Sequence, residues 1–219
     1  MNKFIKTKDL FNCEIDYLKE LFNEEYPWQI LPKIKEFIVK FIENSNSNFF
    51  ELKDGVFVGK NVKIASTATI EAPAIIGEGC EIRPGAYIRG NVIIGTHCVV
   101  GNSSELKNCI LLNNVQVPHY NYVGDSILGN SAHMGAGSIC SNLKADKKTV
   151  VINSDEKIQT NLRKVGAFLG DGADVGCGSV LNPGTIIGKN SNIYPLSCVR
   201  GVVPANAIYK DAKNIVEKR

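Results

Sequence analysis

Starting at Val58, an aliphatic residue recurs at every sixth position of the chain as far as Leu106. The series is Val58, Ile64, Ile70, Ile76, Ile82, Ile88, Ile94, Val100 and Leu106. An amphipathic helix needs apolar residues about 3.6 positions apart and a half-buried strand needs them about 2 apart, so a period of six fits neither pattern. A short, strict period is typical of a solenoid, in which each unit buries its apolar side against its neighbours.

A second, small or apolar residue follows each of these aliphatic residues by four positions. This series is Val62, Ala68, Ala74, Cys80, Ala86, Val92, Cys98, Ser104 and Ile110. In a parallel β-helix of hexapeptides the aliphatic side chain points into the prism and the small residue fits beside it at the corner, with about 18 residues to a coil. We therefore predict an all-β solenoid over residues 51–203.

The repeat is interrupted in three places. The units at Leu106–Ile110 and Val123–Ile127 have five residues instead of six, and the pattern breaks at Cys140. A second run then follows at Leu169, Val175, Leu181, Ile187, Ile193 and Val199. We expect residues 140–164 to form a loop outside the prism, since long loops in compact domains usually have a function. Within it, residues 149–152 and 157–160 are expected to pair as a hairpin.

The two ends of the chain have a different character. Residues 1–50 show helical spacing in two stretches joined through Tyr26-Pro27-Trp28, which predicts two helices with Pro27 near the start of the second. The favoured interpretation is a helical cap over the open edge of the first coil, and the alternative is a part of an acceptor pocket or an oligomer contact. Residues 204–219 are expected to leave the prism as a tail, with a short helix at 212–218.

Composition excludes several classes of protein. The net charge of +3 is small and the basic residues are scattered, which argues against nucleic acid as a partner. There is no 18-residue apolar run and no signal-peptide pattern, so we expect no membrane association. The cysteines number seven and form no CxxC pair, which favours a reduced, cytoplasmic location and no structural metal.

Polar residues able to do chemistry gather between Arg83 and Lys148. His119 lies where the repeat is interrupted by Pro118 and flanked by the shortened units. Histidine is the side chain best suited to accept a proton near neutral pH, and converging cationic side chains suit a phosphate. Departures from local rules tend to mark functional sites, so we regard His119 as the leading catalytic candidate.

Residues 76–203 resemble a known family of enzymes. The matching strings are RPGA at 83–86, VGN at 100–102, ELK at 105–107, PHYNYVGDSILG at 118–129, MGAGSI at 134–139 and SNLKADKKT at 141–149. They are similar to the C-terminal left-handed β-helix of the bifunctional enzymes that acetylate glucosamine-1-phosphate and uridylylate the product. They also resemble the archaeal sugar-1-phosphate nucleotidylyltransferases with C-terminal acetyltransferase domains.

The resemblance implies roles for residues on the acceptor side. His119 would be the general base that takes the proton from the sugar amine, and Asn142 would contact the sugar or the attacking amine. The sugar phosphate would be held by Lys107, Tyr122 and Lys148, and His133 stands where bacterial members place a sugar-binding asparagine.

On the donor side, the resemblance implies direct attack of the amine on the thioester of acetyl-CoA, with no acyl-enzyme and no metal. Backbone amides around Gly135-Ala-Gly137 would steady the oxyanion, so Ala136 and Gly137 are cofactor-side candidates, as is Lys213 in the tail. The resemblance also implies a homotrimer with its sites at subunit boundaries.

The phosphate-binding arginine has two candidates. The family motif points to Arg83 in RPGA, but Arg83 precedes Lys107 by 24 residues, which places the two on different faces. Arg89 precedes Lys107 by 18 residues, one complete coil, and geometry therefore favours it. Arg83 remains the alternative from the motif.

Three other functions compete with an acetyl-CoA-dependent sugar-phosphate N-acetyltransferase. A non-catalytic solenoid would use the same face for sugar-phosphate binding or assembly. A γ-type carbonic anhydrase needs closely paired histidines, whereas the chain has only His97, His119 and His133. Nucleotidyl transfer needs an α/β domain that residues 1–50 are too short to form, so it is not expected.

Overall fold

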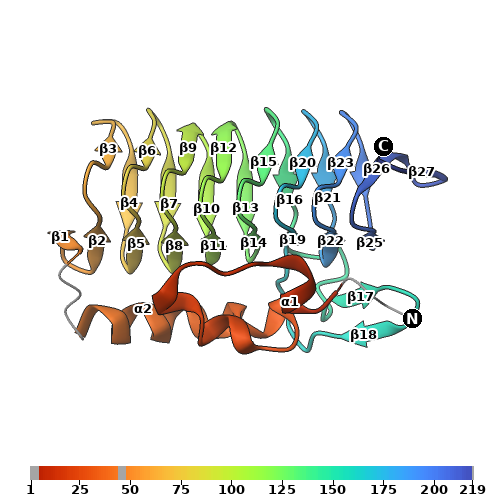
Figure 1. Ribbon diagram of the computed structural model, residues 1–219, viewed down its shortest axis with the longest axis horizontal. Helices are drawn as coiled ribbons and strands as arrows, with labels where there is room; N and C mark the ends of the chain where they lie inside the picture. The colour runs from red at the N-terminus through yellow and green to blue at the C-terminus, as the bar shows by residue number, and fades with distance from the viewer. Residues whose placement is uncertain (1–4, 44–47, 219) are drawn as a thin grey trace.

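The computed structural model describes residues 5–43 and 48–218. Most of the chain from residue 50 onward forms a parallel β-helix (Figure 1). The chain winds through three sheets, here called sheets A, B and C, in that order within each coil. Sheet A contains β1 (Phe50–Lys53), β2 (Val56–Val58), β5 (Ala74–Ile76), β8 (Val92–Ile94), β11 (Cys109–Leu111), β14 (Ile127–Leu128), β19 (Ala167–Leu169), β22 (Thr185–Ile187) and β25 (Val202–Val203).

The other two sheets complete the prism. Sheet B contains β3 (Lys63–Ile64), β6 (Glu81–Ile82), β9 (Val99–Asn102), β12 (Gln116–His119), β15 (His133–Met134), β20 (Asp174–Val175), β23 (Asn192–Ile193), β26 (Ala207–Asp211) and β27 (Asn214–Glu217). Sheet C contains β4 (Thr69–Glu71), β7 (Tyr87–Arg89), β10 (Glu105–Lys107), β13 (Tyr122–Gly124), β16 (Ile139–Cys140), β21 (Val180–Leu181) and β24 (Cys198–Val199).

The strand register confirms the coil length read from the sequence. Ile76 pairs with Ile94, one coil of 18 residues later, and the same step relates Ile88 to Leu106. The predicted inward residues fill the prism, and nearly all of them are fully buried. The repeated aliphatic and small residues therefore form one continuous apolar core along the axis.

The two shortened units are tight corners between sheets C and A. Each omits one corner residue, and Asn108 and Asp125 make these turns alone with φ values of 47° and 48°. A regular corner uses two such residues, as Gly90 and Asn91 do with φ values of 79° and 52°. Asn and Asp tolerate the left-handed region better than most residues, which explains their presence at the two turns. Both shortened corners are thus neighbours on one edge of the prism.

The predicted loop leaves the prism after β16 and returns at β19. Its hairpin is confirmed: β17 (Val151–Asn153) pairs with β18 (Lys157–Gln159) in antiparallel register. Val150 and Ile152 are fully buried and belong to the same apolar cluster as the outward residues of sheet A. The loop is therefore anchored against the prism by its first strand.

The N-terminal segment contains α1 (Thr7–Leu10), η1 (Asp16–Leu18), η2 (Leu21–Asn23), η3 (Pro27–Gln29), η4 (Leu31–Lys33) and α2 (Ile34–Glu43), where η marks a 3-10 turn. The second predicted helix is confirmed as α2, but the prediction that Pro27 lies near its start is wrong, because the 3-10 turns η3 and η4 come between them. The first predicted helix is wrong, since its residues form two separate 3-10 turns, η1 and η2. Leu18 and Leu21 are nevertheless buried in the same apolar cluster, as their spacing predicts.

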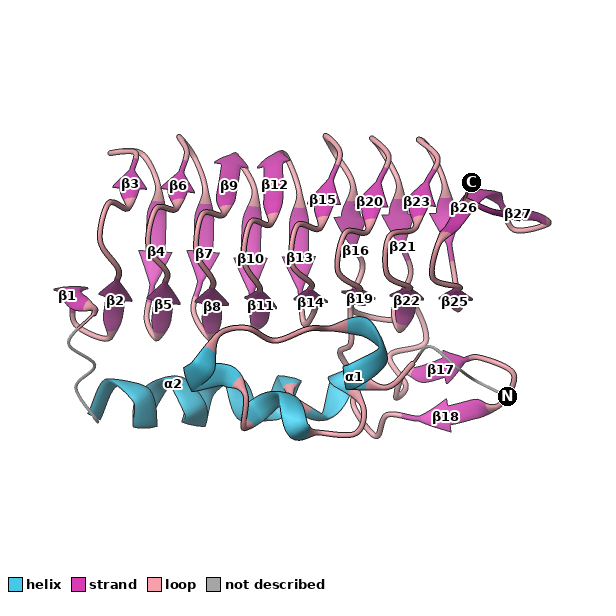
Figure 2. Ribbon diagram, viewed as in Figure 1, coloured by secondary structure: helices cyan, strands magenta, loops and turns pink. Residues whose placement is uncertain are grey.

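The expected position of this segment over the first coil is also wrong. It lies along the outer face of sheet A (Figure 2), where α2 contacts β8 and the ring of Trp28 lies 6.3 Å from that of Phe168. The reason is a column of outward apolar residues on sheet A: Ile75, Ile93, Ile110, Ile127, Phe168 and Ile186. All six are fully buried, so covering this face removes far more apolar surface from water than capping one coil end would.

The C-terminal residues stay with the prism instead of leaving it as a tail. β26 continues sheet B by pairing in parallel with β23, and β27 pairs antiparallel with β26. The helix expected at 212–218 is wrong: residues 214–217 form the exposed strand β27, in which the adjacent β-branched Ile215 and Val216 suit a strand better than a helix.

Candidate active site

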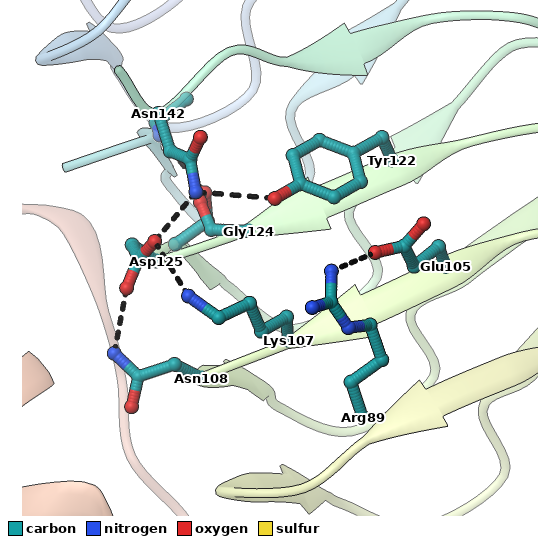
Figure 3. A network of polar contacts seen from close by, with 10 residues as sticks. Arg89, Glu105, Lys107, Asn108, Tyr122, Gly124, Asp125 and Asn142 are labelled. Carbon is teal, nitrogen blue, oxygen red and sulfur yellow. Dashed lines mark hydrogen bonds and ion pairs between the residues drawn. The ribbon is translucent and has the colours of Figure 1, made fainter. Parts of the chain in front are cut away.

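A column of polar residues runs along the outer face of sheet C beside its corner with sheet A (Figure 3). In each three-residue strand of sheet C the middle residue points inward and its two neighbours point outward. Arg89, Lys107 and Gly124 end successive strands, and the register places Lys107 beside Gly124. Adjacent coils lie about 4.8 Å apart, so three coil steps from Arg89 to Asn142 span roughly 14 Å. The sequence therefore brings residues 53 positions apart onto one narrow strip.

Asp125 lies at the centre of this strip, in the second shortened corner. Its side chain is 7% exposed, and its Oδ1 accepts a hydrogen bond from Asn108 Nδ2 at 2.8 Å. Its Oδ2 accepts one from Asn142 Nδ2 at 2.6 Å and lies 3.7 Å from Lys107 Nζ. A buried carboxylate is stable only when its charge and lone pairs are satisfied, and here three side chains from the two neighbouring coils satisfy it.

The side chains of Tyr122 and Asn142 form a hydrogen bond above Gly124, which has no side chain of its own. Asn142 Nδ2 donates to the Tyr122 hydroxyl at 3.1 Å. A Cβ on Gly124 would lie 2.5 Å from the Tyr122 hydroxyl oxygen and 2.8 Å from Asn142 Nδ2, so only glycine leaves room for the ring. Burial raises the pKa of Tyr122, with the nearby Asp125 and Glu105 carboxylates adding to the effect. The phenol therefore stays protonated, and its O–H is free to donate to a ligand.

Arg89 lies one coil before Lys107 on the same strip. Its Nη1 donates to Glu105 Oε1 at 2.7 Å, and its guanidinium carbon lies 5.8 Å from the centre of the Tyr87 ring. Arg83 instead follows β6 in sheet B, where its Nε pairs with Glu81 at 3.1 Å. The structure thus groups Arg89, and not Arg83, with Lys107.

His119 ends β12, at the corner between sheets B and C. Its backbone amide donates to Asn121 Oδ1 at 3.1 Å, and the buried Asn121 is itself tied to Gly135 O at 2.9 Å. The His119 side chain is exposed, and within residues 5–43 and 48–218 its imidazole has no partner. His119 and Tyr122 are three residues apart, so their Cα atoms lie within about 11 Å. The imidazole therefore lies at the edge of sheet C next to sheet B, and the polar strip lies at the edge next to sheet A.

Two other acceptor-side candidates lie away from the strip. His133 is in β15 of sheet B, and its Nδ1 lies 2.8 Å from Asp174 Oδ1. Lys148 is exposed in the loop, where its amide donates to Asp146 Oδ1 at 3.0 Å. Neither side chain contacts the Asp125 network in this structure.

The donor-side candidates form two groups. Ala136 and Gly137 make the corner turn one coil after His119, and Gly137 has a φ of 71°. The Gly135 amide donates to Val175 O and the Gly137 amide to His119 O, so these two cannot also serve an oxyanion without breaking the ladder. Of this turn, the amide of the exposed Ala136 alone has no acceptor among the described residues. Lys213 lies far from it, in the turn between β26 and β27.

The cysteines near the site differ in exposure. Cys140 is fully buried in the prism, and burial raises the pKa of its thiol to about 12, so it is not available as a nucleophile. Cys177 is exposed at the same corner as His119, two coils further along. Cys177 was absent from the predicted site residues, although it follows the inward Val175 by two positions just as Ala136 follows the inward Met134.

Asp125 was also absent from the predicted site residues. It stands in the quoted PHYNYVGDSILG string and inside a shortened unit, two signals that together mark it. Within the described residues, no group of three or more His, Cys, Asp and Glu side chains is arranged to hold a metal ion. None of the helices in that part of the chain combines the length and hydropathy that crossing a bilayer requires.

Comparisons with known proteins agree with this architecture. Residues 70–163 match the model of the GMPPB C-terminal domain. The chain is 33% identical over 240 residues to the "Bifunctional protein GlmU" of Methanococcus maripaludis, covering 100% of this chain and 54% of that protein. It is 32% identical over 189 residues to the "Bifunctional sugar-1-phosphate nucleotidylyltransferase/acetyltransferase" of Sulfurisphaera tokodaii, covering 84% of this chain and 47% of that protein.

Among solved structures, the UDP-N-acetylglucosamine acyltransferase from Campylobacter jejuni superposes with a TM-score of 0.52 at 16% identity, covering 71% of this chain and 67% of that one. This likeness concerns the fold alone. The chain spans about half the length of the curated relatives it matches. It is a left-handed β-helix with the fold of the hexapeptide-repeat acyltransferases, and its sequence resembles those of the bifunctional GlmU and sugar-1-phosphate nucleotidylyltransferase/acetyltransferase proteins.

Proposed function

We propose that this chain is an acyltransferase that moves an acetyl group from acetyl-CoA to the amine of an amino-sugar phosphate such as glucosamine-1-phosphate. The observation that carries the proposal is the polar strip. Arg89, Lys107, Tyr122 and Asn142, four residues to which the resemblance or coil geometry gives acceptor roles, lie on successive coils of sheet C beside one another. The names of the curated relatives support the same class of reaction.

The strip offers groups that suit a sugar phosphate. Arg89 and Lys107 provide two cations one coil apart, and the Arg89 guanidinium has the fork that matches a phosphate. In the free protein Glu105 balances the charge of Arg89, and Asp125 balances that of Lys107. Because Arg89 is the more exposed of the two cations, a phosphate would displace Glu105 from it first. Lys107 stays fixed by Asp125, which keeps one cation in place before the ligand arrives.

The remaining groups would hold the sugar. Both amide hydrogens of Asn142 are directed to Asp125 and Tyr122, which leaves its Oδ1 as an acceptor for a hydroxyl or amine. The Tyr122 hydroxyl accepts from Asn142 and so presents its own proton outward. An acceptor bound here has one end at the strip and its amine toward the His119 side of sheet C.

The chemistry assigned to His119 is proton removal from the attacking amine. The sugar nitrogen forms a C–N bond to the thioester carbonyl carbon, and the collapse of the tetrahedral intermediate breaks the C–S bond. His119 takes the proton lost by nitrogen and returns it to the departing thiolate of coenzyme A. The Ala136 amide, one coil away, is the backbone donor that remains for the developing oxyanion.

We also propose that a second copy of the chain completes the site, as expected for a homotrimer. Sheet A is already covered by the N-terminal segment, so sheets B and C offer the open faces for other subunits. The B–C corner carries Tyr120 and Leu196, which are 63% and 84% exposed and stand on either side of the Gly137 turn. Apolar side chains exposed this fully favour burial against a partner.

The test is an assay of coenzyme A release with glucosamine-1-phosphate, galactosamine-1-phosphate and nucleotide-linked amino sugars as acceptors. We expect turnover with at least one, and a loss of about 10²- to 10⁴-fold in kcat for His119→Ala. His97→Ala is the matched control, because His97 occupies a left-handed corner position on another edge and should leave kcat unchanged. No turnover with any acceptor, together with no binding of coenzyme A, would contradict an enzymatic function.

A further inference from the structure

A cavity lies next to the polar strip, between the prism and the loop. It has a volume of about 650 Å³. Its lining comes from three parts of the chain: the root of the loop with Ser141 and Lys144, the hairpin with Lys157, and the later coils of sheet C with Asn182 and Arg200. Ser141 is adjacent to Asn142, so the cavity begins one residue from the proposed sugar-phosphate site.

The charges that line this cavity are not balanced. Three cationic side chains, Lys144, Lys157 and Arg200, face one carboxylate, Asp146. Asp146 Oδ2 pairs with Lys144 Nζ at 3.3 Å. Among the described residues, Arg200 is held only by the neutral Asn182, whose Oδ1 accepts from Nη2 at 3.3 Å. Lys157 has no partner within the described ranges 5–43 and 48–218.

Two uncompensated cations therefore converge on one hollow from separate elements. A concave surface lined by one sign of charge attracts counter-ions more strongly than a flat one. The lining also has a small apolar part, which includes Leu143, Val151 and Pro183 and suits the ring of a sugar or base. The combination of two cations, amide groups and a small apolar wall fits an organic diphosphate better than a free sugar.

We propose that this cavity is a subsite for the diphosphate group of a nucleotide-type ligand. Lys157 and Arg200 would contact the phosphate oxygens, and Asn182 would orient the arginine. A diphosphate group is present both in a nucleotide-linked amino sugar and in coenzyme A. The inference rests on the proposed function only for the choice between these two ligands. The site itself is defined by binding and does not depend on catalysis.

The experiment is titration calorimetry of the full chain with uridine diphosphate, coenzyme A and glucosamine-1-phosphate as separate probes. The variants are Lys157→Ala and Arg200→Ala. The matched control is Lys164→Ala, an exposed lysine at the other end of the loop that lines a different cavity. All three residues are exposed, so the variants are expected to fold, and thermal melting checks this.

We expect Lys157→Ala and Arg200→Ala to weaken binding of a diphosphate probe at least tenfold while Lys164→Ala changes it less than twofold. Weakened uridine diphosphate binding assigns the subsite to the acceptor, and weakened coenzyme A binding assigns it to the donor. Unchanged affinity for both probes, or no binding of either to the unaltered chain, overturns the proposal. If the diphosphate binds but no acetyl transfer is found, the subsite stands and the proposed function fails.

Discussion

Sheets A and C are built from the same repeat but have opposite outer faces. Both place an apolar residue inward in nearly every strand, as with Ile94 and Leu106. Outward, sheet A carries a column of isoleucines ending in Phe168 and Ile186, whereas sheet C carries Arg89, Lys107 and the Tyr122–Asn142 pair. The first face is covered by the N-terminal segment, and the second is open.

The difference shows that the inward and outward residues of a coil have separate structural roles. The inward residues determine the prism, and the outward ones determine what each face does. One face attaches the rest of the chain, and another collects the polar groups. The loop leaves at the corner between these two faces, so Leu143 and Leu162 wall a cavity of about 480 Å³ beside Asp125 together with Leu31 of the N-terminal segment.

Among substitutions that test this difference between sheets A and C, the largest expected effect is on the free energy of unfolding. Phe168→Ala removes a fully buried ring between sheet A and Trp28 and should lower the free energy of unfolding by about 3–5 kcal/mol. Tyr87→Ala, on the outer face of sheet C, removes a half-buried ring and should cost about 1 kcal/mol or less. Urea denaturation measures both, and equal losses would contradict the assignment of sheet A as the attachment face.

The next effect concerns Asp125. Asp125→Asn removes the charge that faces Lys107 Nζ and replaces an acceptor with a donor opposite Asn142, so it should destabilise the fold by about 1–3 kcal/mol. It should also raise KM for the acceptor at least tenfold through misplacement of Lys107. The control is Asp16→Asn on the N-terminal segment, an exposed carboxylate that pairs only with the exposed Lys19 among the described residues and should change neither. A KM that stays within twofold for Asp125→Asn would show that the network only supports the fold.

A smaller effect is expected from Gly124→Ala. The added methyl group would collide with the Tyr122 hydroxyl and Asn142, and the ring should rotate away at a cost of about tenfold in kcat/KM. In a Tyr122→Ala background only the contact with Asn142 remains, so the second substitution should have a clearly smaller further effect. Additive losses in the double variant would argue that Gly124 matters for a reason other than the ring.

The smallest effect is expected from Cys177→Ser. Although Cys177 is exposed at the His119 corner, direct attack by the amine needs no thiol. The rate of acetyl transfer should change less than twofold. Loss of activity with retention of a labelled acyl group on the unaltered protein would indicate an acyl-enzyme and contradict the proposed mechanism.

Much of the fold follows from the sequence because a hexapeptide period specifies each inward residue independently of distant contacts. The position of the N-terminal segment was missed, although the outward Ile75, Ile93 and Ile110 recur at intervals of 18 and 17 and already mark an apolar face. The C-terminal hairpin was missed because a short run such as Asn214–Glu217 has weak local preference and follows the edge of sheet B.

The candidate site, too, could be predicted only in part from the sequence. Counting coils was enough to place Arg89 beside Lys107, since register follows from the repeat. Asp125 was missed because its importance depends on side chains of three coils, which no spacing within one unit reveals. The loop cavity depends on how the hairpin folds back on sheet C, and that contact has no sequence period.

The central claim is that the outer face of sheet C binds the acceptor. It is tested most directly by KM for the amino-sugar phosphate in Arg89→Ala and Arg83→Ala, two exchanges of the same residue type on sheets C and B. Arg89→Ala should raise KM at least tenfold, since it removes a charged hydrogen-bonding partner of the phosphate, and Arg83→Ala should change it less than twofold. A raised KM for Arg83→Ala with an unchanged value for Arg89→Ala would place the acceptor on sheet B and contradict the account.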